Sequence, residues 1–152
     1  GSGGVATKVA AARMAAFSGI PTVIASADAS DVVQAAVAGE EVGTWIDPRA
    51  DSLPARKLWI AFGLPAMGVI TLDAGAVDAV RNSGGSLLAV GLTGVTGDFS
   101  RGDAVEVLDQ HGSLFAKGIC RFGSDLLKER AGVHSDAIGG EVIHRDDLVI
   151  LD

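Results

Sequence analysis

The residues best suited to chemistry form one continuous run at the start of the sequence: Gly1, Ser2, Gly3, Gly4, Val5, Ala6, Thr7 and Lys8. Glycine lets backbone N–H groups approach an anion, and the helix predicted to follow adds about half a positive charge at its N-terminus. Thr7 offers a hydroxyl, and Lys8 offers a mobile cation for a phosphate group. The run therefore predicts one side of a phosphate-binding site.

A second interpretation of this run stays open. It lacks the Gly-Lys-Ser/Thr ending of a P-loop, and its first four residues are also typical of an artificial linker. No strand-like segment precedes the loop, so we expect the sequence to begin inside a domain.

Composition narrows the class of protein. The sequence is 48% hydrophobic and 20% charged, which indicates a packed globular chain and not a disordered one. A single cysteine, Cys120, excludes an internal disulfide framework and fits a reducing compartment. No apolar run reaches the roughly 20 residues of a transmembrane helix, and no basic segment precedes an apolar N-terminal stretch. We expect a cytoplasmic protein with no membrane partner.

Charge argues against binding to nucleic acid. The formal net charge is −7, and residues 53–152 contain nine basic and thirteen acidic side chains. Sequence-independent binding to nucleic acid depends on Lys and Arg side chains that neutralise phosphates. An acidic domain is therefore a poor candidate, although a local basic patch is compatible with any net charge.

The first third of the sequence alternates between helices and short strands. Gly19 is suited to the left-handed position after a helix, and Pro21 prevents the helix from continuing. We expect helices over residues 7–17 and 31–38, the second capped by Asp28 or Ser30, and strands over residues 22–26 and 42–46. This alternation is typical of an α/β layer fold, of which two strands form only a part. Two prolines in residues 47–54 indicate a boundary between domains over residues 1–52 and 55–152.

Short strands and glycine turns dominate the second domain. We expect a short helix or an extended entry over residues 55–62, and helices over residues 75–82 and 124–131, the last capped by Ser124. We expect strands over residues 69–73, 87–90, 91–96, 104–108, 114–120 and 148–151. Turns at residues 97–98, 101–103 and 110–112 separate several of these strands. The pattern predicts a small β-barrel-like domain.

Several motifs carry a resemblance to a known family. The run from Gly1 to Lys8, followed by residues 19–26 (GIPTVIAS) and 42–45 (VGTW), resembles the end of the amino-acid kinase domain of the glutamate 5-kinase family. Residues 56–60, 94–103 and 142–148 resemble the PUA domain that bacterial members carry at their C-terminus. The resemblance implies an α/β fragment, the end of an amino-acid kinase three-layer sandwich, followed by a mainly-β PUA pseudobarrel with two helices. It also implies that the glutamate pocket and the first phosphate loop lie outside this sequence.

The resemblance also implies an activity. The family transfers a phosphoryl group from ATP to the side-chain carboxylate of L-glutamate, which gives glutamyl 5-phosphate in the first step of proline biosynthesis. It assigns the residues from Ser2 to Lys8 to ATP, with Mg²⁺ bridging the phosphates, and it assigns no catalytic residue or metal ligand to this sequence. The family usually has methionine where this sequence has Val5. We further expect feedback inhibition by proline, a homo-oligomer, and no kinase activity from these 152 residues alone.

Two other functions stay open for residues 55–152. PUA domains of RNA-modifying enzymes bind structured RNA, which here would require one face to gather the basic residues Arg56, Lys57, Arg81, Arg101, Lys117, Arg121, Lys128 and Arg130. A regulatory or oligomerisation domain is the other alternative, and we favour it over RNA binding.

Two groups of reactive residue types have simpler explanations. One group has the residue types that bind metals: His144, Asp146 and Asp147. Adjacent carboxylates on a strand, however, point to opposite faces of the sheet. We therefore expect a polar edge before the last strand. We expect Cys120 to be a small core residue.

Overall fold

The computed structural model of the chain describes residues 4–132 and 139–152. The chain divides into two compact units, Gly1–Leu58 and Trp59–Asp152. This division lies shortly after residue 55, where the sequence predicts the second domain to begin. Each unit is described by itself below.

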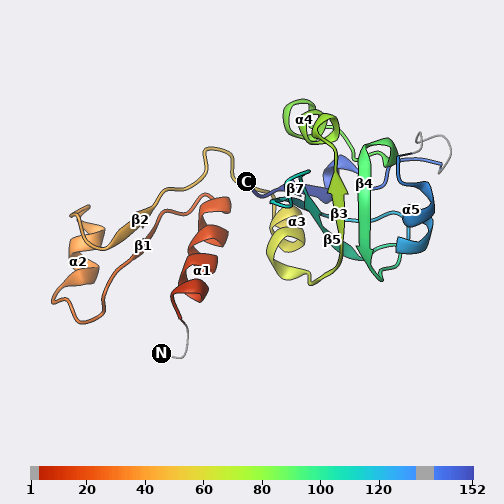
Figure 1. Cartoon of the computed structure of the whole chain (residues 1–152). Coiled ribbons are helices and arrows are strands. Elements are labelled where there is room, and N and C mark those ends of the chain that lie inside the picture. The colour runs from red at the N-terminus through yellow and green to blue at the C-terminus, as the bar shows by residue number, and fades with distance from the viewer. Residues whose placement is uncertain (1–3, 133–138) are drawn as a thin grey trace. The chain divides into compact units, whose positions relative to one another are not determined.

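The first unit combines one long helix with a small two-stranded sheet. Its elements are α1 (Val5–Phe17), β1 (Thr22–Ile24), α2 (Val32–Val37), β2 (Thr44–Ile46) and α3 (Ala55–Leu58). The two strands pair antiparallel, with Thr22 opposite Ile46, and Figure 1 shows them side by side. Helix α1 begins two residues before its predicted start and ends as predicted, because Gly19 takes a left-handed φ of 76°.

The second helix of this unit departs from the prediction at its start. Its N-cap is Asp31, which has a left-handed backbone and makes no capping hydrogen bond with its side chain. The prediction that Asp28 or Ser30 caps this helix is therefore wrong. The helix has only six residues, so little of its stability can come from its own hydrogen bonds.

The first unit has a small core. Among its described residues the buried hydrophobic side chains are Ala12, Ala16 and Phe17. Arg49 stacks over the Phe17 ring at 4.5 Å, and its backbone N–H donates to the carbonyl oxygen of Ala16 at 2.9 Å. These contacts hold the chain after β2 against the end of α1. Other large apolar side chains of the unit stay exposed: Val5, Val9, Met14, Ile20, Val33, Val37 and Trp45.

The second unit is built on a five-stranded sheet. Its strands are β3 (Ala66–Leu72), β4 (Leu92–Gly97), β5 (Ala104–Leu108), β6 (Leu114–Ile119) and β7 (Leu148–Ile150). They lie in the order β4-β3-β5-β6-β7, in which β3 and β5 pair parallel and the other neighbours pair antiparallel. A π-helix occupies Trp59–Gly63, and 3₁₀ turns occupy Ala89–Gly91 and Arg145–Asp147.

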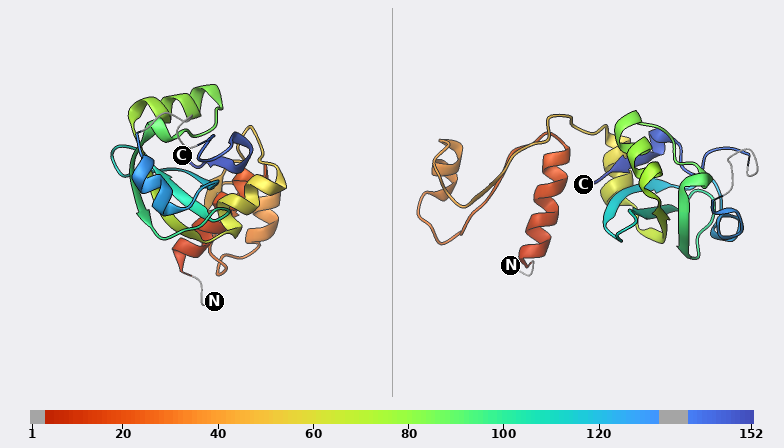
Figure 2. Two further views of the ribbon diagram at one scale, coloured as in Figure 1. Left: turned by 90° about the vertical axis from the view of Figure 1, so that its right-hand side faces the viewer. Right: turned by 45° about the horizontal axis from the view of Figure 1, so that its top comes forward.

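Two helices complete the second unit. Helix α4 (Ala74–Ser83) lies over one end of the sheet in each view of Figures 1 and 2, and Gly84 ends it in a left-handed conformation. Helix α5 (Ser124–Arg130) lies beside β4. The prediction that Ser124 caps this helix is wrong, because Gly123 is the N-cap. Ser124 is buried inside the first turn, where its hydroxyl oxygen accepts from the backbone N–H of Phe99 at 3.4 Å.

The predicted strand over residues 87–90 is also wrong. Leu87 makes one isolated bridge to Ile143, after which the chain turns into the 3₁₀ helix Ala89–Gly91. Gly91 explains the turn, since a Cβ there would lie 2.3 Å from the Cβ of Ala76 in α4. The segment bends where Gly91 packs closely on α4. The pattern of residues 87–90 gives no indication of that contact.

One continuous core stabilises the second unit. Its largest fully buried side chains include Phe115, Ile70, Leu72, Leu87, Leu127 and Ile143. Cys120 lies in this core, as predicted, and burial raises the pKa of its thiol to about 12. In the described part of the chain, no helix is both long enough and apolar enough to span a membrane.

Candidate functional site

The predicted phosphate-binding run lies at the start of α1. Gly4 is the N-cap and has an extended backbone, and Val5 to Lys8 form the first turn. The backbone N–H groups of Thr7 and Lys8 both point back to the carbonyl oxygen of Gly4, at 3.1 and 3.4 Å. Ser2 and Gly3 lie outside the described residues.

The geometry of this turn suits an anion. The first N–H groups of any helix lack intrahelical acceptors, and here no acidic side chain occupies the first turn. Gly4 has an ordinary φ of −67°, and nothing in the described chain lies within 4 Å of where its Cβ would be. The fold itself therefore does not require glycine at this position, whereas a ligand that approaches the backbone would benefit from it.

Lys8 borders a shallow groove that the sequence did not reveal. The groove has a volume of about 370 Å³ and is lined by Lys8, Ala11 and Ala12 of α1 and by residues 22–25 of β1 and its end. The other lining residues are uncharged, so Lys8 supplies the only cationic group among the residues that line the groove. Residues 22–25 belong to the motif at residues 19–26, but that motif does not indicate the groove, because these residues reach it only through the packing of β1 against α1.

The candidate metal residues do not form a metal site in the described chain. The described residues contain no group of three or more His, Cys, Asp or Glu side chains that could hold a metal ion. Asp146 and Asp147 lie in a 3₁₀ turn, so the prediction that they lie on a strand is wrong. The turn precedes β7 directly, where the sequence predicts a polar segment. His144 caps this turn, because its Nδ1 accepts from the backbone N–H of Asp146 at 3.3 Å.

Several cations of the second unit are engaged within the chain. Lys117 is buried, and its ammonium donates to the carbonyl oxygens of Ala61 and Leu64. Other pairs join Arg81 to Asp152, Arg121 to Glu141 at 2.7 Å, and Lys128 to the carbonyl oxygen of Gly97 at 2.9 Å. These contacts reduce the positive charge available to an RNA backbone.

Comparison with known proteins gives the family. Residues 68–141 match the PUA domain family. Over 99% of its length the chain is 43% identical to a glutamate 5-kinase from Shewanella oneidensis, of which it covers 43%. It is 40% identical, with the same two shares, to a glutamate 5-kinase from Synechococcus elongatus. A crystal structure of a PUA domain from Aeropyrum pernix K1, in a tartrate complex, is 29% identical, covers 60% of this chain and 49% of its own, and has a TM-score of 0.46.

The chain thus spans less than half the length of the curated relatives that it matches. The similarity nevertheless runs through both units, since it covers almost all of the 152 residues. The chain belongs to the glutamate 5-kinase family, as its C-terminal part, and its second unit contains a PUA domain.

Proposed function

We propose that the protein to which this chain belongs transfers the γ-phosphoryl group of ATP to the side-chain carboxylate of L-glutamate, in the first step of proline biosynthesis. The observation that carries the proposal is the identity of 40–43% over 99% of the chain to proteins named glutamate 5-kinase. The site at the start of α1 supports it, because it offers N–H donors and a lysine where phosphate oxygens would need them.

In this proposal residues 2–8 bind the ATP phosphates. Free N–H groups at the start of α1 bind phosphate oxygens, and the open surface at Gly4 lets the nucleotide approach the backbone. Lys8 neutralises charge that develops on the transferred group. Mg²⁺ bound together with ATP would supply further neutralisation of the phosphate charge. The first turn of α1 contains no carboxylate that would hold the ion.

The proposal assigns this activity to a polypeptide of the relatives' length, and we expect these 152 residues alone to be inactive. Support comes from the surface of the first unit. Val5 and Val9 are 74% and 45% exposed on α1, and Val37 is 85% exposed on α2. Helices with apolar residues on all sides are normally buried, so α1 has the composition of a helix that other segments cover.

A hydroxylamine trap tests the activity directly. The complete polypeptide is incubated with ATP, Mg²⁺, L-glutamate and hydroxylamine, which converts an acyl phosphate into a hydroxamate that is detected as its coloured iron(III) complex. We expect glutamate-dependent hydroxamate, and we expect Lys8→Ala to lower kcat by about 100-fold, as for a lost charge contact in the transition state. Lys8→Arg, which keeps the charge, should lose less.

Arg130→Ala is the matched control, because it removes an exposed cation from the second unit. It should leave kcat and KM unchanged. An unchanged rate of hydroxamate formation in Lys8→Ala would refute the proposed role of Lys8 but not the proposed kinase activity. An absence of glutamate-dependent product from the unsubstituted protein would refute the activity itself.

The same proposal includes a cytoplasmic homo-oligomer that proline inhibits. Measuring hydroxamate formation with increasing L-proline tests the inhibition, and light scattering of the complete polypeptide tests the assembly. RNA binding is not favoured, because Lys117, Arg81 and Arg121 already contact groups of their own chain.

A further inference from the structure

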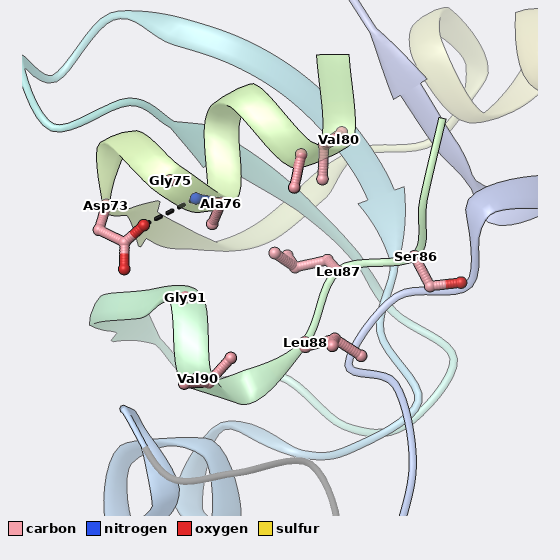
Figure 3. A pocket seen from close by; sticks show the side chains of 10 residues that line it. Asp73, Gly75, Ala76, Val80, Ser86, Leu87, Leu88, Val90 and Gly91 are labelled. Carbon is pink, nitrogen blue, oxygen red and sulfur yellow. Dashed lines mark hydrogen bonds between the residues drawn. The ribbon is translucent and has the colours of Figure 1, made fainter. Parts of the chain in front are cut away.

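A pocket lies between α4 and the segment that leads into β4, far in sequence from the proposed nucleotide site. Its volume is about 310 Å³, at the lower end of the range for pockets that bind small molecules. Figure 3 shows Ala76 and Val80 pointing down from α4 toward Leu87, with Leu88 and Val90 at the lower side and Asp73 at one end.

The apolar walls of this pocket are fixed by the core. Val80 and Leu87 are 3% and 1% exposed and belong to the central cluster of the second unit. The lower wall lies close to α4 because Gly91 has no side chain, since a Cβ there would overlap with Ala76. The cavity is therefore preformed, and a ligand would not have to open it.

Asp73 gives the pocket one charged group. Its Oδ1 accepts from the backbone N–H of Ala76 at 2.7 Å, which caps α4. Figure 3 shows the other carboxylate oxygen directed away from that N–H group. No ion pair found among the described residues involves Asp73, and its side chain is only half-buried.

The sign of the field favours a cation at this end of the pocket. The N-terminus of α4 contributes about half a positive charge, whereas Asp73 contributes one full negative charge. The cap bond uses Oδ1, which leaves Oδ2 available to accept a hydrogen bond from a ligand. No basic side chain is among the residues that line the pocket.

We propose that this pocket binds a small organic amine, with an aliphatic or alicyclic body between α4 and residues 87–91 and a protonated nitrogen on Asp73. The apolar body contacts Ala76, Val80 and Leu87, and the ammonium group donates to Oδ2 of Asp73. The inference goes beyond the kinase proposal and does not depend on it, because it uses only residues of the second unit.

Three ligands with the same ring and different head groups test the charge preference. Cyclohexylamine, cyclohexanol and cyclohexanecarboxylate are titrated at pH 7 into the uniformly ¹⁵N-labelled whole chain, and amide shifts are followed by NMR. We expect saturable shifts at Gly75, Ala76, Leu88 and Gly91. Cyclohexylamine should bind about fivefold tighter than cyclohexanol, as for a partly exposed charge contact, and cyclohexanecarboxylate should bind weakest.

Two variants connect this preference to the pocket. Asp73→Asn removes the charge but keeps a good helix cap, so it should abolish the difference between the amine and the alcohol without unfolding α4. Ala79→Phe places a ring at an exposed wall position and should weaken all three ligands. The proposal is overturned if amine and alcohol bind equally, if the carboxylate binds best, if the preference persists in Asp73→Asn, or if no shift saturates.

Discussion

Lys117 allows a quantitative test of how the second unit holds its π-helix. The residue lies on β6, in register between Glu106 on β5 and Val149 on β7, and it is 8% exposed. Its Nζ donates to the carbonyl oxygen of Ala61 at 3.2 Å and to that of Leu64. Both carbonyls lie at the end of the π-helix Trp59–Gly63, where helix carbonyl oxygens lack intrahelical donors.

Replacing Lys117 by methionine keeps the length of the side chain and removes its donors. Hydrogen bonds from a charged donor contribute about 1.5–3 kcal/mol each, and the variant loses two of them. The loss is partly offset because burial disfavours the ammonium, which lowers the pKa of Lys117. We therefore expect Lys117→Met to lower the free energy of unfolding of the second unit by about 2–3 kcal/mol.

Hydrogen exchange at Leu64 reports this loss locally. The backbone N–H of Leu64 donates to the carbonyl oxygen of Trp59 at 3.1 Å, so it exchanges when the π-helix opens. Its exchange should accelerate about 30- to 150-fold, and the free energy of unfolding of the whole chain, measured with urea, should fall by the same amount, about 2–3 kcal/mol. Lys128→Met is the control, because Lys128 also donates to a backbone carbonyl but at an exposed position, and it should cost less than about 1 kcal/mol. Unchanged Leu64 exchange in Lys117→Met would refute the reasoning.

Three further predictions concern the core and the pocket. Burial raises the pKa of the Cys120 thiol from 9.0 to about 12, so the stability that the neutral thiol contributes is complete below pH 9 and decreases between pH 9 and pH 12. The free energy of unfolding should therefore fall by roughly 3 kcal/mol by pH 11, and this fall should be absent in Cys120→Ala. Equal decreases of stability with alkaline pH in the two proteins would contradict this prediction. Gly91→Ala should destabilise the chain by about 1–3 kcal/mol through its overlap with Ala76, and chemical denaturation should show partial recovery in the double variant with Ala76→Gly. Asp73→Ala should cost about 1 kcal/mol through the lost cap, whereas Asp73→Asn should cost little; equal thermal midpoints for the two variants would exclude the capping role.

Local chemistry explains where the sequence predicted the fold well. The turns predicted at residues 101–103 and 110–112 are present, and Gly102 and Gly112 have a positive φ that glycine adopts without strain. Gly97 also has a positive φ, but it is the last residue of β4, and the turn predicted at residues 97–98 is not formed. Strand β5 has the predicted bounds, since an alternating β-branched run between glycine turns indicates a strand without help from distant residues. Helix α4 was predicted to within one residue at each end for the same reason.

Contacts between distant segments explain where the prediction failed. Residues 87–90 have the composition of a strand, but Leu87 pairs with Ile143, and Gly91 packs on α4. Lys117 has the sequence appearance of a surface cation, yet it is buried because its partners are backbone carbonyls of residues 61 and 64. Every residue has a backbone carbonyl group, so the sequence does not indicate which carbonyl groups accept hydrogen bonds from Lys117.

The candidate phosphate site was predictable in part. Residue types alone placed Gly4, Thr7 and Lys8 at the start of a helix, and the structure has them there. The groove beside Lys8 was not predictable, because it depends on how residues 22–25 pack against α1. The pocket at Asp73 was missed for a related reason: the sequence analysis placed residue 73 at the end of a strand, and only the fold shows that Asp73 caps α4 and borders a cavity.

The two units differ in how far they bury their apolar side chains, and this difference affects the proposed role of Lys8. The second unit buries a complete core, whereas α1 exposes Val5, Val9 and Met14 on a helix whose only charged residues are Lys8 and Arg13. A cation stabilises a developing negative charge strongly only where water is excluded, because the interaction weakens as the dielectric constant rises. With α1 as exposed as it is here, Lys8 would be screened by solvent and contribute little. In the proposed reaction, the apolar surface of α1 and the contribution of Lys8 would therefore be linked. A segment that covered Val5 and Val9 would also lower the dielectric constant around the lysine, so the effect of Lys8→Ala on kcat should be large only in a protein where α1 is covered.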